Sequence, residues 1–297
     1  MIKRYLIADH LVSLEMPQSP LWDRLSNYVP FESTAEGEPV FHLEVCDIST
    51  DAAPSRPESM KPVLVGAAEP GAPRLDLYSD GSLWWVEMAP VDDRPVCAWL
   101  TMSSDMTRGS VRVSMDSDNG RFAVDNSMML LFAFRTSVMG TLEMHSSVVV
   151  RGGRGFMFLG RSGTGKSTHS RMWLKHLDGV HLLNDDNPVI RIGADGKATV
   201  YGTPWSGKTP CYRNESVPVG AIVRIRQCPD NRIQRQNVME AYASIFSSCS
   251  GFRAVRSMAD GLHSTISALV TGVPCYILDC RPDGDAARVC SEEVDGD

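Results

Sequence analysis

The chain has 297 residues, of which 43% are hydrophobic and 22% are charged, and it carries a formal net charge of −7. This composition is typical of a globular protein with a sizeable core, long enough for one large domain or two ordinary ones. The acidic balance and the dispersed basic residues argue against a nucleic-acid partner, and no apolar run is long enough to cross a bilayer.

The N-terminus and the cysteines bear on where the protein works. The first eight residues start basic but meet Asp9 and His10 at once, so we expect no secretory signal peptide. The eight cysteines are scattered without a C-x-x-C pair, and we expect free or buried thiols rather than a disulfide framework. Both expectations favour a cytoplasmic protein with no membrane partner.

Residues 1–120 are expected to form a β-rich region, because no segment there has a convincing helical pattern. The expected strands are bounded by turn residues and comprise residues 41–45, 75–88, 96–102 and 110–115, the second of these being a hairpin around Asp80-Gly81. Residues 48–74 are rich in proline and are expected to be loop, and a polar turn at residues 116–120 closes the region.

From residue 121 to residue 297 the pattern alternates between helix and strand, which predicts an α/β core with a mixed sheet. A buried helix is expected to begin at a cap on Asp125 or Asn126 and to end near Met139. The later expected strands are residues 142–150, 156–159, 180–183, 221–225 and 275–278, and the expected helices are residues 166–177, 238–246, 262–270 and a short terminal one. Asn237 and Glu240 resemble a capping box.

Residues 160–167 read Gly-Arg-Ser-Gly-Thr-Gly-Lys-Ser and match the pattern G-x-x-x-x-G-K-[ST] completely. A predicted strand precedes them and a predicted helix follows, which is the context that a phosphate-binding loop requires. The loop amides would surround a polyphosphate, Lys166 would reach its terminal phosphates, and the Ser167 hydroxyl would bind Mg²⁺. The motif thus predicts binding of a nucleoside triphosphate such as ATP, through Gly160, Ser162, Gly163, Thr164, Gly165, Lys166, Ser167 and Thr168.

Asp185 and Asp186 end the apolar run at residues 180–183. A phosphoryl-transfer site needs an acidic group to hold Mg²⁺ and often a second one to orient or deprotonate the acceptor. Adjacent side chains on a strand face opposite sides, so both carboxylates can face the phosphates only if the strand has already ended. Asn187-Pro188 indicates that it has, and the alternative is an ordinary solvated turn.

Three more residues are candidates that have an ordinary structural alternative. His145 lies on the strand ahead of the one that enters the phosphate loop, where it is equally compatible with a satisfied core residue. Residues 201–214 are rich in turn formers and carry Lys208 and Arg213, which could neutralise charge on a transferring phosphoryl group. These two are equally compatible with ordinary surface cations.

Taken together, these residues resemble the HPr kinase/phosphorylase-like family, whose catalytic core is related to phosphoenolpyruvate carboxykinase. The resemblance covers roughly the last 170 residues and rests on His145, the phosphate loop and Leu183-Asn184-Asp185-Asp186. It implies a carboxykinase-like core with a mixed sheet at residues 121–297, preceded by the β-rich region at residues 1–120. It also implies that Asp185 acts on the acceptor hydroxyl and Asp186 helps hold the metal, or the reverse.

The resemblance has limits that shape the functional expectation. Residues 202–222 look like stand-alone kinase-related members, some of which are thought to modify precursors of ribosomally made peptides, and the segment that marks the bifunctional HPr enzymes is missing. The resemblance therefore implies an ATP-dependent kinase for a hydroxyl, on a serine of a protein or peptide. A small-molecule kinase and a catalytically silent nucleotide-binding regulator are the alternatives. The acceptor and the oligomeric state, a homo-oligomer included, stay open.

Overall fold

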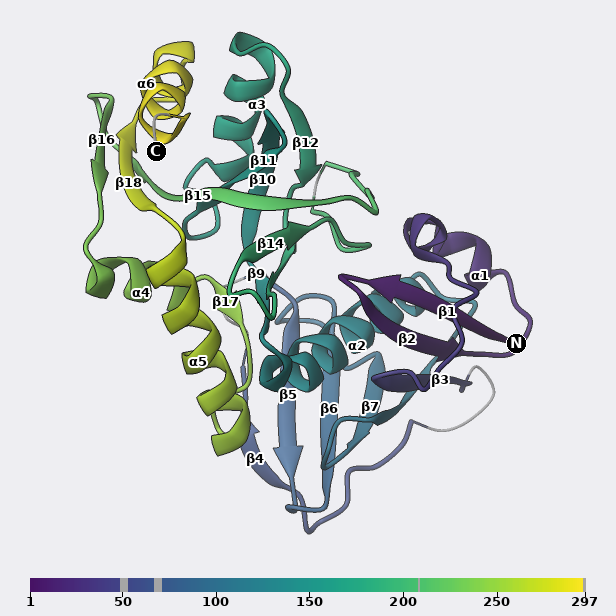
Figure 1. Cartoon of the computed structure of the whole chain (residues 1–297). Coiled ribbons are helices and arrows are strands. Elements are labelled where there is room, and N and C mark those ends of the chain that lie inside the picture. Colours follow the sequence, from purple (N-terminus) through teal and green to yellow (C-terminus); the bar gives the residue numbers. More distant parts are fainter. Residues whose placement is uncertain (49–52, 67–70, 208, 296–297) are drawn as a thin grey trace. The chain divides into compact units, whose positions relative to one another are not determined.

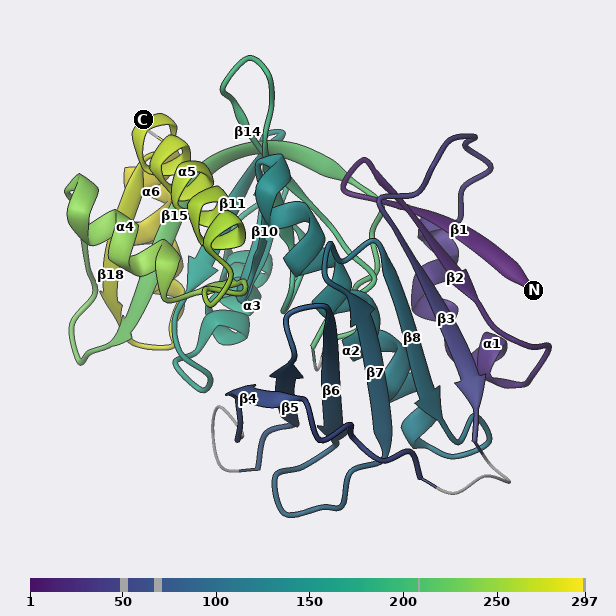
Figure 2. The same cartoon turned by 90° about the horizontal axis from the view of Figure 1, so that it is seen from below.

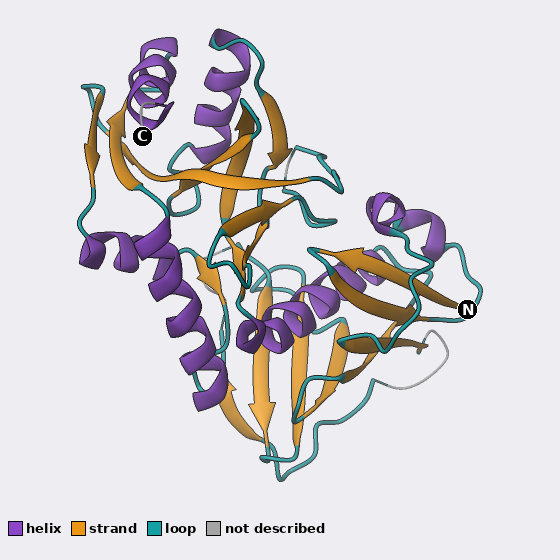
Figure 3. Cartoon of the chain, in the orientation of Figure 1, coloured by secondary structure: helices purple, strands orange, loops and turns teal. Residues whose placement is uncertain are grey.

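The computed structural model describes residues 1–48, 53–66, 71–207 and 209–295. The chain is a mixed α/β protein that forms two compact units, Met1–Arg135 and Thr136–Asp297, each with a mixed sheet of its own (Figures 1 and 3). No helix within these ranges combines the length and the apolar character that crossing a membrane requires.

The first unit is built on an eight-stranded sheet with the strand order β1-β2-β3-β8-β7-β6-β5-β4. Its strands are β1 (Ile2–Ile7), β2 (His10–Glu15), β3 (Phe41–Asp47), β4 (Lys61–Leu64), β5 (Arg74–Ser79), β6 (Leu83–Ala89), β7 (Ala98–Ser103) and β8 (Arg108–Val113). The pairs β2–β3 and β3–β8 are parallel and the others antiparallel. Figure 2 shows β3, β8, β7 and β6 side by side.

Helix α2 (Asn119–Thr136) packs on this sheet, and a short helix α1 (Leu21–Arg24) and a 3₁₀ segment η1 (Ser26–Phe31) follow β2 in the chain. Gly109 of β8 allows α2 to approach closely, because a Cβ at that position would lie 2.6 Å from Leu131 Cδ1. Phe41, Leu43 and their apolar neighbours on the sheet are fully buried.

The prediction that α2 begins at a cap on Asp125 or Asn126 is wrong, since the helix begins at Asn119. The Asp125 carboxylate is occupied elsewhere, because Asn27 Nδ2 and Arg121 Nε donate to it. The helix is part of the first unit, although the sequence pattern groups it with the region that follows.

The strands predicted at residues 41–45, 75–88, 96–102 and 110–115 are confirmed, including the hairpin around Asp80-Gly81. The prediction that residues 48–74 are loop is wrong for β4, which lies at the sheet edge with all four residues exposed. Such a strand has no alternation of buried and exposed residues that a sequence pattern could reveal. β1 and β2, at the opposite edge, were also not predicted.

The second unit has a ten-stranded mixed sheet. Its path is β12-β10-β11-β15-β14-β13-β9-β17, with β18 beside β15 and β16 beside β18. The strands are β9 (Thr141–Met144), β10 (Ser146–Arg151), β11 (Arg154–Leu159), β12 (His181–Asn184), β13 (Val189–Ile192), β14 (Ala198–Tyr201), β15 (Ser216–Gln227), β16 (Arg232–Arg235), β17 (Cys249–Ser250) and β18 (Cys275–Cys280). Strand β15 runs parallel to β11 and to β18, so these three strands end at the same edge.

Helices cover both faces of this sheet. α3 (Lys166–His176) and α6 (Gly284–Asp295) pack on one face, and α4 (Val238–Phe246) and α5 (Arg256–Gly272) pack on the other. The central strand β11 shows the division, because Phe156 and Phe158 pack with Trp173 of α3 while Met157 and Leu159 join the cluster of α4 and α5. Burial on both faces explains why β11 reads as a continuous apolar run.

The predicted α/β core with a mixed sheet is confirmed, and so is the capping box of α4, where Asn237 and Glu240 exchange their hydrogen bonds. The single strand predicted at residues 142–150 is wrong, because β9 and β10 are separate strands interrupted at His145. The His145 backbone N–H donates to Ser248 O at 2.7 Å, next to the β9–β17 pair Met144–Cys249, whereas the Ser146 N–H donates to Asp186 O at 2.9 Å. All eight cysteines are free thiols.

Candidate active site

The phosphate loop, residues 160–167, connects β11 to α3. Gly160, Gly163 and Gly165 have φ angles of 156°, 77° and 101°, in the region that favours glycine. A Cβ at Gly160 would lie 2.3 Å from Thr164 Oγ1, whose hydroxyl donates to Arg161 O at 2.8 Å. The turn therefore depends on glycine at the positions that the motif specifies.

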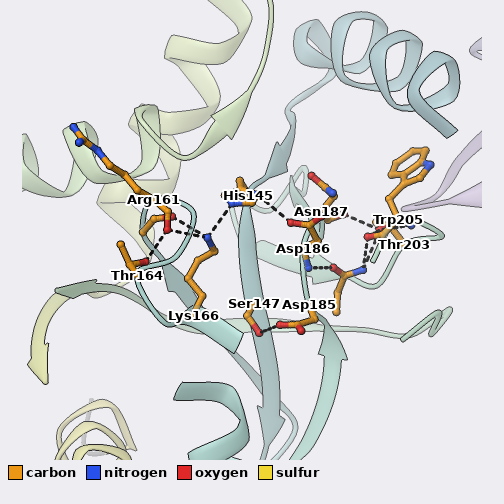
Figure 4. A network of polar contacts seen from close by, with 12 residues as sticks. His145, Ser147, Arg161, Thr164, Lys166, Asp185, Asp186, Asn187, Thr203 and Trp205 are labelled. Atoms are coloured by element: carbon orange, nitrogen blue, oxygen red, sulfur yellow. Dashed lines mark hydrogen bonds and ion pairs between the residues drawn. The ribbon is translucent and has the colours of Figure 1, made fainter. Parts of the chain in front are cut away.

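Lys166 is the first residue of α3, and its side chain is buried against the loop. Its Nζ donates to Gly160 O at 3.0 Å and to Arg161 O at 3.4 Å. The same ammonium lies 2.9 Å from His145 Nε2 (Figure 4). Two backbone carbonyls of the loop and His145 thus hold the ammonium group that the motif predicts to bind phosphates.

His145 connects Lys166 to Asp186. An ammonium group can only donate, so Nε2 accepts from Lys166 and the ring proton is on Nδ1. Nδ1 lies 3.1 Å from Asp186 Oδ1 and donates to it (Figure 4). The side chain of His145 is 43% exposed, which is unlike a core residue. The break between β9 and β10 places this ring between the loop and the carboxylate.

Asp185 is buried and accepts a hydrogen bond from Ser147 Oγ at 2.7 Å. Ser147 Oγ also lies 2.6 Å from Ser170 Oγ on α3. Because Ser147 gives its one hydroxyl proton to Asp185, Ser170 donates to Ser147. The carboxylate is therefore fixed to the helix that follows the phosphate loop.

The two carboxylates follow the end of β12 at Asn184, which confirms that the strand has ended before them. Asn184 Oδ1 accepts from the Asp186 backbone N–H at 2.9 Å. Asn184 Nδ2 donates to Thr203 Oγ1 and to Trp205 O, both at 3.1 Å. The buried Asn184 thus joins the carboxylate turn to the loop after β14.

That loop is predicted to supply two cations, Lys208 and Arg213. Lys208 lies outside the described residues. The Arg213 Nη1 lies 4.0 Å from Glu215 Oε2. The Arg213 side chain is 51% exposed, and within the described ranges it makes no contact with Lys166. Within the described residues the Arg213 guanidinium pairs with Glu215, and its catalytic role stays a prediction.

Glu143 of β9 is a buried carboxyl group that the sequence analysis did not identify. Burial, and then the negative charge of Asp186, raise the pKa of Glu143 to about 8, against a hydrogen bond from Ser250 that lowers it. Its Oε2 has no hydrogen-bond partner among the described residues. Glu143 is therefore largely protonated at neutral pH and lies close enough to Asp186 for their charges to interact.

Sequence reasoning also missed Ser147 and Ser170, which hold Asp185 in place. One signal points to all three missed residues. Each is a polar side chain in a segment that the fold buries, as Glu143 is between Leu142 and Met144. A buried polar group requires a partner, so such positions identify networks even before the partner is known.

The expected Mg²⁺ ligands, Ser167 and Asp186, are both accessible. Ser167 is half-buried in the first turn of α3, and the Asp186 side chain is 32% exposed. No cluster of three or more His, Cys, Asp or Glu suited to a metal occurs in the parts of the chain that the structure describes. This donor set fits Mg²⁺, which keeps several waters and binds one or two carboxylates together with phosphate oxygens.

Comparison with known proteins adds little to this geometry. No family model matches the sequence, and no curated protein matches it. One solved structure that matches is the Hpr(Ser) kinase/phosphatase from Coxiella burnetii, at 12% sequence identity and a TM-score of 0.30, over 52% of this chain and 94% of that chain. A likeness this distant carries no functional argument, so the chemistry has to be argued from the residues.

Proposed function

We propose that this chain is an ATP-dependent kinase that transfers the γ-phosphoryl group to a hydroxyl, with Mg²⁺ as its metal. One observation carries the proposal, namely that Lys166 of a complete phosphate loop is joined through His145 to Asp186, beside Asp185. Phosphoryl transfer requires positioning and charge stabilisation far more than covalent chemistry from the protein. Lys166 supplies the cation, and the two carboxylates supply a metal ligand and a group for the acceptor.

We assign Asp186 to the metal. Through His145 it is connected to Lys166, the cation expected at the terminal phosphates. A carboxylate that binds Mg²⁺ with the phosphates has to lie next to that cation, and Ser167 would complete the protein ligands. When bound, Mg²⁺ would neutralise charge on the β- and γ-phosphates.

We assign Asp185 to the acceptor hydroxyl. Ser147 fixes one of its oxygens at 2.7 Å. A Cβ at Gly207 would lie 3.2 Å from Asp185 O, so the backbone of Asp185 lies against the loop at residues 202–214. Asp185 would take the proton of the acceptor hydroxyl while the hydroxyl oxygen bonds to the γ-phosphorus. The bond from that phosphorus to the oxygen of the β-phosphate would break, and ADP would leave.

We propose a serine of a protein or peptide as the acceptor, with the precursor of a ribosomally made peptide as one candidate. The supporting observation is exposure, since the side chains of His145 and Asp186 are 43% and 32% exposed. A site this open admits a residue that is part of a large molecule. A small-molecule acceptor and a silent nucleotide-binding protein are then outcomes of the test.

The test is transfer from ATP labelled at the γ-phosphate to the proteins, peptides and metabolites of a cell extract, read by mass spectrometry. We expect a labelled protein or peptide, with labelling lost in Lys166→Ala and kept in Lys175→Ala, an exposed lysine of the same helix. A labelled metabolite alone would make this a small-molecule kinase. Binding of Mg-ATP without transfer or hydrolysis would contradict the kinase assignment and favour the regulator.

A further inference from the structure

A cavity of about 700 Å³ lies beside the phosphate loop. Gly163, Gly165 and Thr168 of the nucleotide-binding segment form one side of it. The opposite side is formed where β15 and β18 end, and these strands run parallel to the one that enters the loop. Ligands of α/β proteins bind outside the carboxyl ends of such strands. The cavity is therefore continuous with the place where phosphates are expected.

His169 lies in the wall of this cavity and is only 3% exposed. The Trp173 indole donates to His169 Nε2 at 3.0 Å, and an indole N–H can only donate. Nε2 therefore carries no proton, and the ring is neutral with its proton on Nδ1. Phe158 packs edge-on against the ring at 4.6 Å between centroids, which fixes its plane.

The Nδ1–H of His169 is a hydrogen-bond donor without an acceptor among the described residues. Nδ1 is not one of the fully buried atoms that lack a partner in the described residues, so it is accessible from the cavity and can donate to a ligand there. Nε2 is directed to the buried Trp173, so Nδ1 is the ring nitrogen left for the cavity.

The rest of the wall suits a flat ring with polar edges. Ile225, Pro229 and Pro282 provide apolar surface, and Cys228 and Cys280 belong to the same lining. Cavities for small organic ligands combine such apolar walls with a few fixed polar groups. A nucleobase with its ribose has apolar faces and acceptor atoms at its edge, and its phosphates would reach the loop next to it.

We propose that this cavity takes the nucleoside part of the nucleotide and that His169 Nδ1–H donates to an acceptor on the base or the ribose. The inference rests on the proposed use of ATP and goes beyond it, because it assigns a residue that the phosphate-loop motif does not specify. His169 is then a binding residue that distinguishes a nucleotide from a bare polyphosphate.

The test compares Mg-ATP with Mg-tripolyphosphate, which offers the same phosphates without a nucleoside, by calorimetry. We expect the wild type to bind ATP at least tenfold more tightly than tripolyphosphate, with about a tenfold weakening for ATP alone in His169→Gln. Glutamine places an acceptor near the position of Nε2 for Trp173 while it removes Nδ1–H. His169→Phe, which keeps a ring against Phe158, should show the same selective loss, and His176→Gln, an exposed position at the end of the same helix, should show none.

A second readout needs no variant. Cys228 is half-buried in the cavity wall, so alkylation of its thiol, followed by peptide mapping, reports whether the cavity is filled. Burial first, and then the charges of Asp283 and Asp279, raise the pKa of the neighbouring Cys280 thiol to about 11, which leaves it largely unreactive. Mg-ATP should protect Cys228, and Mg-tripolyphosphate should not.

The outcomes separate this inference from the proposed function. Equal affinities for ATP and tripolyphosphate, equal protection of Cys228, or an equal loss of both ligands in His169→Gln would overturn the nucleoside site while the phosphate loop still stands. Binding of neither ligand by the wild type would overturn the phosphate loop assignment and the nucleoside site with it.

Discussion

Lys166 Nζ and His145 Nε2 lie 2.9 Å apart, and this contact fixes the tautomer of the ring. Because the ammonium must donate, the imidazole presents its lone pair on Nε2 and its proton on Nδ1, where Asp186 accepts it. The lysine of the loop and the carboxylate of the turn are therefore positioned by one ring. A displacement of the ring would change the positions of both Lys166 and Asp186.

Replacing His145 by alanine tests this coupling. Lys166 keeps its bonds to Gly160 O and Arg161 O, so ATP binding should change little. The rate of transfer should fall by roughly 10- to 100-fold, as is common when a residue that orients a metal ligand is removed. Titration calorimetry for ATP and a single-turnover assay measure the two quantities. Equal losses of binding and rate would show that His145 supports the loop instead.

Asparagine substitutions separate the two carboxylates without breaking their contacts. In Asp185→Asn the remaining carbonyl oxygen still accepts from Ser147, and in Asp186→Asn it still accepts from His145. We expect Asp185→Asn to bind Mg-ATP normally and to lose transfer, since the acceptor's proton has no base. We expect Asp186→Asn to require a higher Mg²⁺ concentration for the same rate.

The measurement is the rate of transfer as a function of Mg²⁺ concentration, together with Mg-ATP affinity. If the two phenotypes are exchanged, Asp186 serves the acceptor and Asp185 the metal. If neither variant differs from the wild type, the carboxylates are structural.

The parts of the site that the sequence predicts are those with a local signature. The phosphate loop needs glycine at fixed positions for its own turn, as Gly160 against Thr164 shows, so the motif and the geometry carry the same information. The capping box of α4 is local in the same way, because Asn237 and Glu240 bond each other's backbone N–H groups.

The remaining parts depend on residues distant in sequence. Ser147 meets Asp185 only because β10 and β12 are neighbours, and Glu143 interacts with Asp186 only after the chain has returned by way of β12. At the strand break, the His145 backbone N–H donates to Ser248 O, more than a hundred residues later in the chain. The periodicity of the sequence contains no information on such contacts. The sequence could therefore predict the helices and strands but not this network.

Glu143 should make the stability of the second unit depend on pH. The ordinary pKa of a glutamate side chain is 4.5, and the pKa of Glu143 in the folded protein is about 8. Between these values the folded state holds a proton that the unfolded state has released, so a rise in pH favours unfolding. The contribution of this proton to the free energy of unfolding is fully present below the ordinary pKa. It is lost as the pH rises to the pKa of the folded state, and the loss is at most about 5 kcal/mol.

Glu143→Gln removes the titrating group and keeps its shape. Urea unfolding of both proteins from about pH 5 to about pH 9 gives the difference in free energy of unfolding. We expect the wild type to lose stability relative to Glu143→Gln as the pH rises. A difference that stays constant over this range would mean that Glu143 ionises normally, and that burial and Asp186 do not act on it as described.

Arg213 tests whether the loop at residues 202–214 acts on the transferring group. Its guanidinium lies 4.0 Å from Glu215 Oε2, so a catalytic role requires the side chain to contact the phosphoryl group when substrates are bound. If it does so, Arg213→Lys keeps the charge but loses the planar fork, and the rate of transfer should fall by about tenfold or more while ATP affinity changes little. Lys208→Ala should show a smaller effect of the same kind.

The matched control is Arg256→Lys, an arginine 94% exposed at the start of α5. A rate equal to that of the control would leave Arg213 as a structural partner of Glu215 and remove the loop's cations from the catalytic mechanism.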